Sequence, residues 1–185
     1  MNRTKNAIID TFWQLLDEKP YNKITVKDIV NRCQISRNTF YYHFHDITEL
    51  LEITLKTDAD DIIQTYGESD APLACITNLI ERCTVRKKAI LHIYRSVLRE
   101  YFMNELERIA LYTVTRYIDT VTAGQSIPDD SKMLLIRFYK CLFVGIFLDW
   151  LDNGMKYELS RYITQIDGLF NDAIEQAYLK VVRST

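Results

Sequence analysis

The chain has 185 residues, enough for one or two small domains, and its 48% hydrophobic and 26% charged residues are ordinary for a soluble globular protein. Residues 1–45 hold seven Lys/Arg against four Asp/Glu, a net charge of +3, which leaves −5 for the rest of a chain whose total is −2. Composition alone indicates no function, but this asymmetry excludes the C-terminal part as the main surface for a polyanion and favours the N-terminal part.

The first predicted helix runs from about Arg3 to Asp17 and ends before Pro20. Its apolar residues form one broad stripe, made of Ile8, Ile9, Phe12, Trp13, Leu15 and Leu16. A stripe of this width predicts that the helix covers the two short helices that follow it.

The second predicted helix begins at a capping box, in which Thr25 caps the helix and Asp28 reaches back to the cap. Four apolar residues then recur at helical spacing: Val26, Ile29, Val30 and Cys33. They predict one buried face, and a short turn around Gln34 separates this helix from the next.

The third predicted helix lies within residues 36–44, with Ser36 as its N-cap. Phe40 and Phe44 are four residues apart and share one face, which predicts that they anchor the helix to its own domain. The other faces carry groups that suit phosphate oxygens and base edges, on Arg37, Asn38, Thr39, Tyr41, Tyr42 and His43. Two short helices joined in this way match a helix-turn-helix, whose second helix enters the DNA major groove.

These residues resemble the N-terminal domain of the tetracycline-repressor (TetR) family. The resemblance covers residues 24–30, 35–44 and 50–51, and beyond about residue 55 only the all-helical pattern is similar. Residues 41–44, followed by Asp46-Ile47 and Leu50-Leu51, also resemble the branch named for regulators of dihydroxyacetone kinase genes. The resemblance implies an N-terminal DNA-binding domain, residues 1–46, and a C-terminal ligand-sensing and dimerisation domain, residues 47–185.

The resemblance also implies roles for single residues at DNA. Arg37 and Asn38 are expected to reach base edges, and Tyr42 to contact bases or phosphates. Phosphate contacts are expected from Thr25, Lys27, Thr39, Tyr41 and His43, and Ser36 and His45 complete the expected DNA-binding set.

Two positions depart from the family pattern. Gln34 stands where the family usually has a glycine, and at a positive φ a side chain costs on the order of 1 kcal/mol. Ile47 stands where the family commonly has a lysine that touches a phosphate, so that contact is expected to be absent or moved to His45.

The fourth predicted helix begins near Asp46 and ends at Gly67, about 20 residues or 30 Å. A breaker cluster, residues 67–72, separates it from a fifth helix, and further helices are predicted at about 87–102, 104–122 and 129–152. Arg86-Lys87-Lys88 is a candidate second patch for DNA or an acidic partner, the alternative being simple solvation of a corner. The prolines and most glycines fall at helix ends, so the expected fold is all-α with about nine helices and no strand.

The helix at 129–152 is apolar nearly all round, which predicts burial on two sides. Phe138, Leu142 and Gly145 cover one side, and Phe143, Phe147 and Trp150 cover another. A last helix also has an apolar face, and the family usually forms dimers, so we expect a two-fold four-helix interface. The residues assigned to it are Phe143, Phe147, Trp150, Ile166, Phe170 and Ile174; the alternative is a bundle within one chain.

The resemblance further implies a ligand pocket among the fourth to eighth helices, and no residue set identifies its ligand. Six residues on the apolar faces of their helices are the candidates for its lining: Tyr66, Cys83, Tyr94, Thr113, Tyr117 and Phe138. The alternative is that these side chains only fill the core. His92 is left out, because it falls on the polar face of its helix with Lys88 and Arg95 and is expected to be exposed.

The leading hypothesis is a DNA-binding transcription regulator, a repressor, that binds double-stranded operator DNA as a homodimer and is controlled by a small-molecule effector or a partner protein. A helix-turn-helix coactivator controlled by a partner protein is the alternative, and a helical-bundle enzyme is the remote one. No Glu-x-x-His motif, phosphate loop or nucleophile elbow supports an enzyme, and no cofactor is expected.

Metal, redox and membrane functions are also disfavoured. Asp58, Asp60 and Asp61 could ligate a divalent cation, but more simply solvate a helix face. The four cysteines, at 33, 75, 83 and 141, show no C-x-x-C pair and are expected to be reduced and buried rather than zinc-binding or redox-sensing. No signal peptide is visible, and the longest apolar run, residues 141–148, is far shorter than the roughly 20 residues that span a bilayer, so a cytoplasmic protein is expected.

Overall fold

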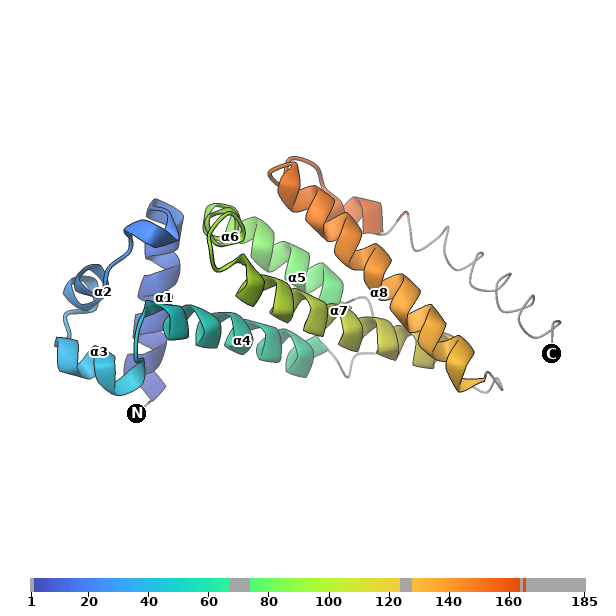
Figure 1. Ribbon diagram of the computed structural model, residues 1–185, viewed down its shortest axis with the longest axis horizontal. Helices are drawn as coiled ribbons and strands as arrows, with labels where there is room; N and C mark the ends of the chain where they lie inside the picture. The colour runs from blue at the N-terminus through green and yellow to red at the C-terminus, as the bar shows by residue number, and fades with distance from the viewer. Residues whose placement is uncertain (1, 67–73, 124–127, 164, 166–185) are drawn as a thin grey trace. The chain divides into compact units, whose positions relative to one another are not determined.

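A computed structural model describes residues 2–66, 74–123, 128–163 and 165, and of Asn2, Tyr66 and Val121 it describes the backbone only. The elements, in chain order, are α1 (Asn2–Glu18), the 3-10 helix η1 (Tyr21–Lys23), α2 (Val26–Cys33), α3 (Arg37–His43), α4 (Ile47–Tyr66), α5 (Ala74–Val85), α6 (Lys87–Tyr94), α7 (Arg99–Val121) and α8 (Asp129–Asp152) (Figure 1). These ranges contain no strand, which confirms the predicted all-α class. None of the described helices combines the length and apolarity needed to cross a bilayer.

The chain divides into two compact units. The first unit comprises Met1–Gln64 and Glu81–Leu106, and the second comprises Thr65–Ile80 and Glu107–Thr185. The first unit therefore holds the whole helix-turn-helix, most of α4 and all of α6. The expected functional division between residues 46 and 47 stays a prediction.

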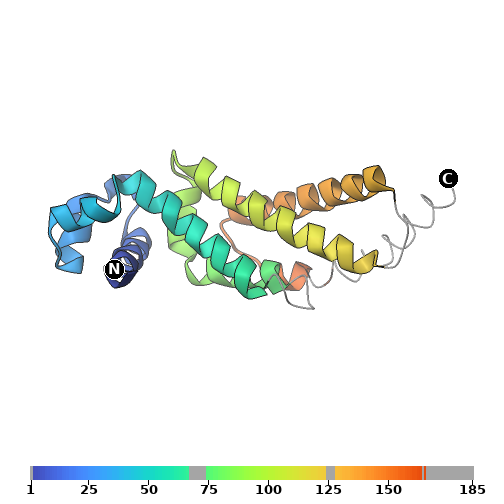
Figure 2. The same ribbon diagram turned by 90° about the horizontal axis from the view of Figure 1, so that it is seen from below.

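The core of the first unit is built around α1. Ile8, Phe12 and Leu16 are fully buried and four residues apart, so they form one face of the helix. This helix packs against α2 and α6, and Figure 2 shows the three short N-terminal helices gathered at the start of α4. The core is completed by buried residues of α2, α3 and α4, namely Ile29, Phe40, Leu50 and Leu51. The predicted covering role of α1 is thus confirmed.

The core of the second unit lies between α8 and the parts of α5 and α7 that belong to this unit. Buried residues from these helices are Cys75, Ile76, Ile109, Ala110, Ile118, Phe147, Trp150 and Leu151. An ion pair at its surface joins Nζ of Lys140 in α8 to Oε2 of Glu107 in α7 at 3.0 Å.

The assignment of the two apolar sides of α8 needs correction. Phe143, Phe147 and Trp150, which were expected at a dimer interface, are buried within the chain itself. The side that remains exposed carries Leu134 and Phe138, the latter 56% exposed. Periodicity could not distinguish the sides because both are apolar. The other residues expected at the interface, Ile166, Phe170 and Ile174, lie outside the described residues.

The end of α8 agrees with the sequence prediction. Gly154 and Met155 adopt φ values of 67° and 55°, and the Met155 amide donates to the Trp150 carbonyl at 2.8 Å. A left-handed residue with this hydrogen bond stops a helix and reverses the chain, and glycine adopts that conformation at no steric cost.

The predicted helix at 87–102 is wrong, because α6 ends at Tyr94 and α7 begins at Arg99. Ser96 accounts for the break, since its Oγ donates to the Ile93 carbonyl at 2.8 Å and accepts from the Leu98 amide at 3.1 Å. A serine that bonds to nearby backbone groups in this way competes with the helical hydrogen bonds.

Candidate nucleic-acid interface

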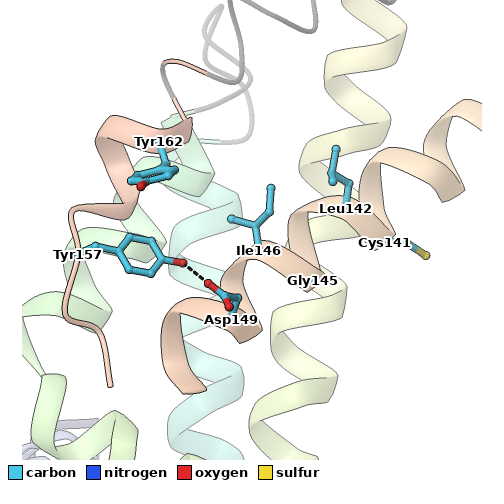
Figure 3. A pocket seen from close by; sticks show the side chains of 7 residues that line it. All are labelled: Cys141, Leu142, Gly145, Ile146, Asp149, Tyr157 and Tyr162. Atoms are coloured by element: carbon cyan, nitrogen blue, oxygen red, sulfur yellow. Dashed lines mark hydrogen bonds between the residues drawn. The ribbon is translucent and has the colours of Figure 1, made fainter. Parts of the chain in front are cut away.

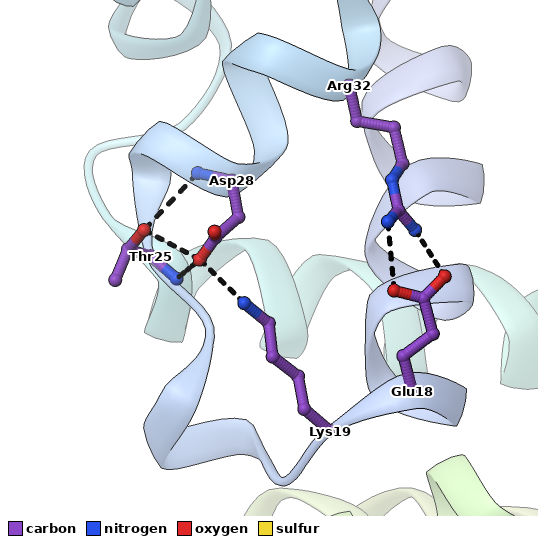
Figure 4. A network of polar contacts seen from close by, with 5 residues as sticks. All are labelled: Glu18, Lys19, Thr25, Asp28 and Arg32. Carbon is purple, nitrogen blue, oxygen red and sulfur yellow. Dashed lines mark hydrogen bonds and ion pairs between the residues drawn. The ribbon is translucent and has the colours of Figure 1, made fainter.

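The start of α2 is held by the capping box that the sequence predicts. The Asp28 amide donates to Oγ1 of Thr25 at 3.2 Å, and the Thr25 amide donates to Oδ2 of Asp28 at 2.8 Å. Nζ of Lys19 lies 2.9 Å from the same carboxylate oxygen (Figure 4). The hydrogen bonds from Lys19 and Thr25 lower the pKa of the Asp28 carboxyl to about 2, so the cap keeps its charge at neutral pH.

A bidentate ion pair joins α2 to α1. Nη1 and Nη2 of Arg32 donate to Oε1 and Oε2 of Glu18 at 2.6 and 2.8 Å (Figure 4). Two parallel hydrogen bonds fix the orientation of both groups. Sequence analysis missed this pair because its members lie on different helices, and no local spacing connects them.

The turn between α2 and α3 contains a residue in the left-handed region. Gln34 has φ 53° and ψ 44°, and its amide donates to the Val30 carbonyl. The Ile35 amide donates to the same carbonyl at 3.1 Å. The turn therefore keeps a positive φ at the position where the resembling family usually has glycine.

The helix α3 is fixed by a cap at its start and by two phenylalanines along one face. Oγ of Ser36 accepts from the Thr39 amide at 3.0 Å. Phe40 and Phe44 are buried, with ring centroids 5.9 Å apart, and Nζ of Lys5 in α1 lies 5.8 Å from the centroid of the Phe44 ring. Both the predicted cap and the predicted anchors are confirmed.

The polar side chains expected at DNA lie mostly on the outside of the first unit. Arg37 and Asn38 are exposed, and Tyr41 and Tyr42 are 53% and 68% exposed. Among the other expected residues, Thr25, Lys27, Ser36 and His45 are exposed, and Thr39 and His43 are half-buried. Large aromatic side chains left in solvent, next to two buried ones on the same helix, indicate a surface that contacts another molecule.

The start of α4 lies next to this surface in the chain. The Glu49 amide donates to Oδ1 of Asp46 at 2.9 Å, which confirms Asp46 as the cap and lowers the pKa of its carboxyl. The His45 amide donates to the Glu49 carboxylate, and Nδ1 of His45 lies 3.2 Å from Oδ2 of Asp46. Ile47 is half-buried, whereas the His45 side chain is 88% exposed, so of the two only the histidine projects into solvent.

Reciprocal hydrogen bonds join the end of α1 to α6. Oδ1 of Asp17 accepts from the Ala89 amide at 3.2 Å, near the start of α6. Nδ1 of His92 lies 2.7 Å from the Leu16 carbonyl, and since a carbonyl only accepts, this nitrogen carries the proton. The expectation that His92 is solvent-exposed is wrong, because it is half-buried against α1. Its partner is 76 residues away, so helical periodicity gave no signal for it.

The acidic residues of α4 pair with arginines. Asp58 bonds to Arg86 and Asp61 to Arg82, and the guanidinium carbon of Arg86 lies 4.4 Å from the centroid of the Trp13 ring. Burial raises the pKa of Asp58 despite these arginines. Within the described ranges, no three His, Cys, Asp or Glu side chains gather as metal ligands would. Arg86 therefore belongs to a contact with α1 and α4 and not to a solvated basic corner.

The six residues expected to line a ligand pocket are divided between the units. Cys83 and Tyr94 are buried in the first, where burial raises the pKa of Cys83 to about 12. In the second, Thr113 is buried, Tyr117 is half-buried and Phe138 is exposed rather than inward-facing; the Tyr66 side chain lies outside the described residues.

The four cysteines are free thiols, but not all are buried as expected. Cys75 and Cys83 are buried and Cys33 is half-buried, whereas Cys141 is exposed. Cys141 lies on the side of α8 that sequence analysis took to be covered.

Replacing Gln34 by glycine is expected to raise the free energy of unfolding by about 0.5–1 kcal/mol, because glycine adopts a left-handed φ without the clash of a Cβ. Urea denaturation measures the change. Gln34→Ala is the matched control: it removes the side chain beyond Cβ, keeps the clash, and should give no gain. If glycine and alanine had the same effect, backbone strain at this turn would be disproved.

Comparison with known proteins agrees with this geometry. A family model described as "Bacterial regulatory proteins, tetR family" matches residues 8–53, and one described as "Transcriptional regulator C-terminal region" matches residues 70–172. A curated relative, the uncharacterized HTH-type transcriptional regulator YxbF of Bacillus subtilis (strain 168), is 34% identical over 71 residues, which are 38% of this chain and 19% of that protein. The matched part thus spans about a fifth of the relative's length.

A solved structure shares the fold over nearly the whole chain. It is described as "Dihydroxyacetone kinase operon activator DhaS" and matches with a TM-score of 0.78 and 19% identity, over 95% of this chain and 98% of that one. Two family models thus cover the N-terminal helices and the C-terminal region in turn. The chain belongs to the tetR family of bacterial regulatory proteins and is a helix-turn-helix transcriptional regulator.

Proposed function

We propose that the protein represses transcription by binding operator DNA as a homodimer, through α3, under the control of an effector bound in its C-terminal part. The observation that carries the proposal is the division of α3 into two faces. Phe40 is fully buried, whereas Arg37, Asn38 and the two tyrosines face solvent. A helix anchored in this way can enter the major groove without loss of its own packing.

The roles at DNA follow from the chemistry of each side chain. Arg37 and Asn38 stand in the first turn of α3, where a guanidinium pairs with guanine and an amide with adenine. The remaining expected residues, Thr25, Lys27, Thr39, Tyr41, Tyr42, His43 and His45, act mainly on phosphates. Oγ of Ser36 and Oγ1 of Thr39 lie 2.9 Å apart, so both hydroxyls are already engaged in the cap.

The test is a gel-shift and fluorescence-anisotropy titration with the DNA upstream of the protein's own gene, over a series of salt concentrations. Arg37→Ala is expected to cost about 1–3 kcal/mol and to relax the base preference at one operator position. Lys27→Ala, the control for a phosphate contact, should weaken all sequences alike and lower the salt slope by about one. An Arg37→Ala variant with unchanged affinity and base preference would show that α3 does not read bases.

We place the dimer contact on the exposed side of α8. Met133 and Leu134 are 61% and 67% exposed, and with Phe138 they form an apolar patch on one helix. Exposed apolar patches are typical of protein interfaces, and closed two-fold dimers are the commonest oligomers. A dimer would also bring two copies of α3 to half-sites about 34–36 Å apart, or a multiple of that spacing.

Phe138→Glu is expected to give monomers with weaker operator binding, because a carboxylate buried at the contact would lack a partner. Sedimentation velocity and the same DNA titration measure the two effects. Leu111→Glu is the matched control, since Leu111 is 49% exposed on α7 and the substitution adds the same charge elsewhere. A wild-type chain that sediments as a monomer at micromolar concentration would refute the dimer.

Effector control rests on the buried polar side chains in the C-terminal part of the chain. Cys83, Tyr94 and Thr113 combine hydroxyl or thiol groups with burial, the combination that orients a mostly apolar ligand. A ligand that favours the DNA-incompetent conformer by a few kcal/mol would suffice as a switch.

Activation through a partner protein is the second candidate function. The structural relative is described as an operon activator, which bears on the sign of regulation but at 19% identity supports only the shared fold. A reporter gene fused to the upstream DNA separates the candidates: deletion of the regulator raises expression for a repressor and lowers it for an activator. We retain a non-enzymatic, cytoplasmic protein without cofactor as part of the proposal, in keeping with the family of regulators to which the chain belongs.

A further inference from the structure

A groove runs along α8 in the second unit, away from every residue assigned above to DNA or to an effector. Its volume is about 490 Å³, within the range of small-molecule sites. The residues that line it are Cys141, Leu142, Gly145, Ile146, Asp149, Tyr157 and Tyr162 (Figure 3).

The groove exists because the chain turns back after α8. Gly154 and Met155 reverse its direction, and the indole Nε1 of Trp150 then donates to the Tyr157 carbonyl at 2.8 Å. This hydrogen bond holds Tyr157 beside the last turns of the helix. At Gly145 the position of a Cβ meets no atom within 4 Å, so the groove stays open above α8 at that point.

A carboxylate with only neutral partners stands at one end of the groove. Oδ2 of Asp149 accepts from the Tyr157 hydroxyl at 2.8 Å, and Oδ1 accepts from Nδ2 of Asn153 at 3.1 Å. Among the described residues, no lysine or arginine forms an ion pair with Asp149. A carboxylate offers about four acceptor positions, so two of them remain available to a ligand.

The charge relation within this pair is stable at neutral pH. Burial, and then the hydrogen bond to Asp149, raise the pKa of Tyr157 to about 12. The tyrosine therefore remains a neutral donor, and the negative charge stays on the carboxylate.

Two aromatic rings stand on the side opposite the helix. The centroids of Tyr157 and Tyr162 are 5.1 Å apart, with 52° between the ring planes, and Figure 3 shows both rings across from Ile146 and Leu142. The face of a tyrosine ring attracts cations, and the aliphatic side chains of α8 suit an apolar tail. One carboxylate with apolar neighbours does not suit a divalent metal, which takes six or more oxygen ligands or fixed waters.

We propose that this groove binds a small organic cation, an ammonium group carrying an apolar tail, with the charge at Asp149 and the tail between the tyrosines and α8. The site is independent of the DNA-binding surface, so it stands or falls apart from the proposed function. Its recognition chemistry is an ion pair supported by cation–π contact.

The test uses 2-phenylethylammonium chloride as the probe and 2-phenylethanol as its neutral counterpart, titrated into the full chain by calorimetry. Tryptophan fluorescence gives a second readout, because Trp150 is bonded to the groove through Tyr157. The ammonium is expected to bind about tenfold more tightly than the alcohol. Asp149→Asn should abolish that preference, whereas Tyr157→Phe, which keeps both the ring and the carboxylate, should preserve it.

Gly145→Leu should weaken both probes, since its side chain would fill the groove, and thermal melts verify that each variant folds. Equal affinity for the two probes, or an ammonium preference that survives Asp149→Asn, would overturn the proposal. So would the absence of binding at millimolar probe concentration. If Gly145→Leu instead shifted the monomer–dimer equilibrium while no probe bound, a second copy of the chain would be the occupant and the cation proposal would be wrong.

Discussion

The seven residues of α3 are too few to form a stable helix alone, because helix nucleation is costly and most helical stability in proteins comes from packing. Phe40 and Phe44 supply that packing. Burial of a phenylalanine contributes on the order of 1.5–3 kcal/mol, so two of them outweigh the propensity of any other side chain in so short a helix. The exposed face of α3 is therefore free to carry side chains chosen for a partner.

The surroundings of α3 are arranged to keep those two rings in place. The caps at Thr25 and Ser36 satisfy the first amides of α2 and α3, and the left-handed Gln34 sets the angle between the helices. The ion pair of Arg32 with Glu18 then holds α2 against α1. Each device acts on orientation more than on total stability, because the groups involved are at the surface.

Sequence patterns predicted most of this arrangement because its determinants are local. A cap, a turn residue or a pair of apolar residues four apart is encoded within a few positions, so Thr25, Gln34 and Phe40 could be assigned from their neighbours alone. The apolar sides of α8 could not, because Phe138 and Phe147 look alike in a sequence, and only the partner helices determine which is buried. Ser96 and His92 failed for a related reason: each bonds to a backbone carbonyl that no periodicity of its own helix identifies.

The contact between α1 and α6 has a consequence for motion. Asp17 accepts from an amide at the start of α6, and His92 donates to a carbonyl at the end of α1, so each helix satisfies a free polar group of the other. Sliding one helix along the other would strand both groups at once, at a cost of roughly 1–3 kcal/mol for each buried group left unpaired. The two helices are therefore mechanically locked, and α6 can be displaced only by carrying α1 with it or by breaking two hydrogen bonds together.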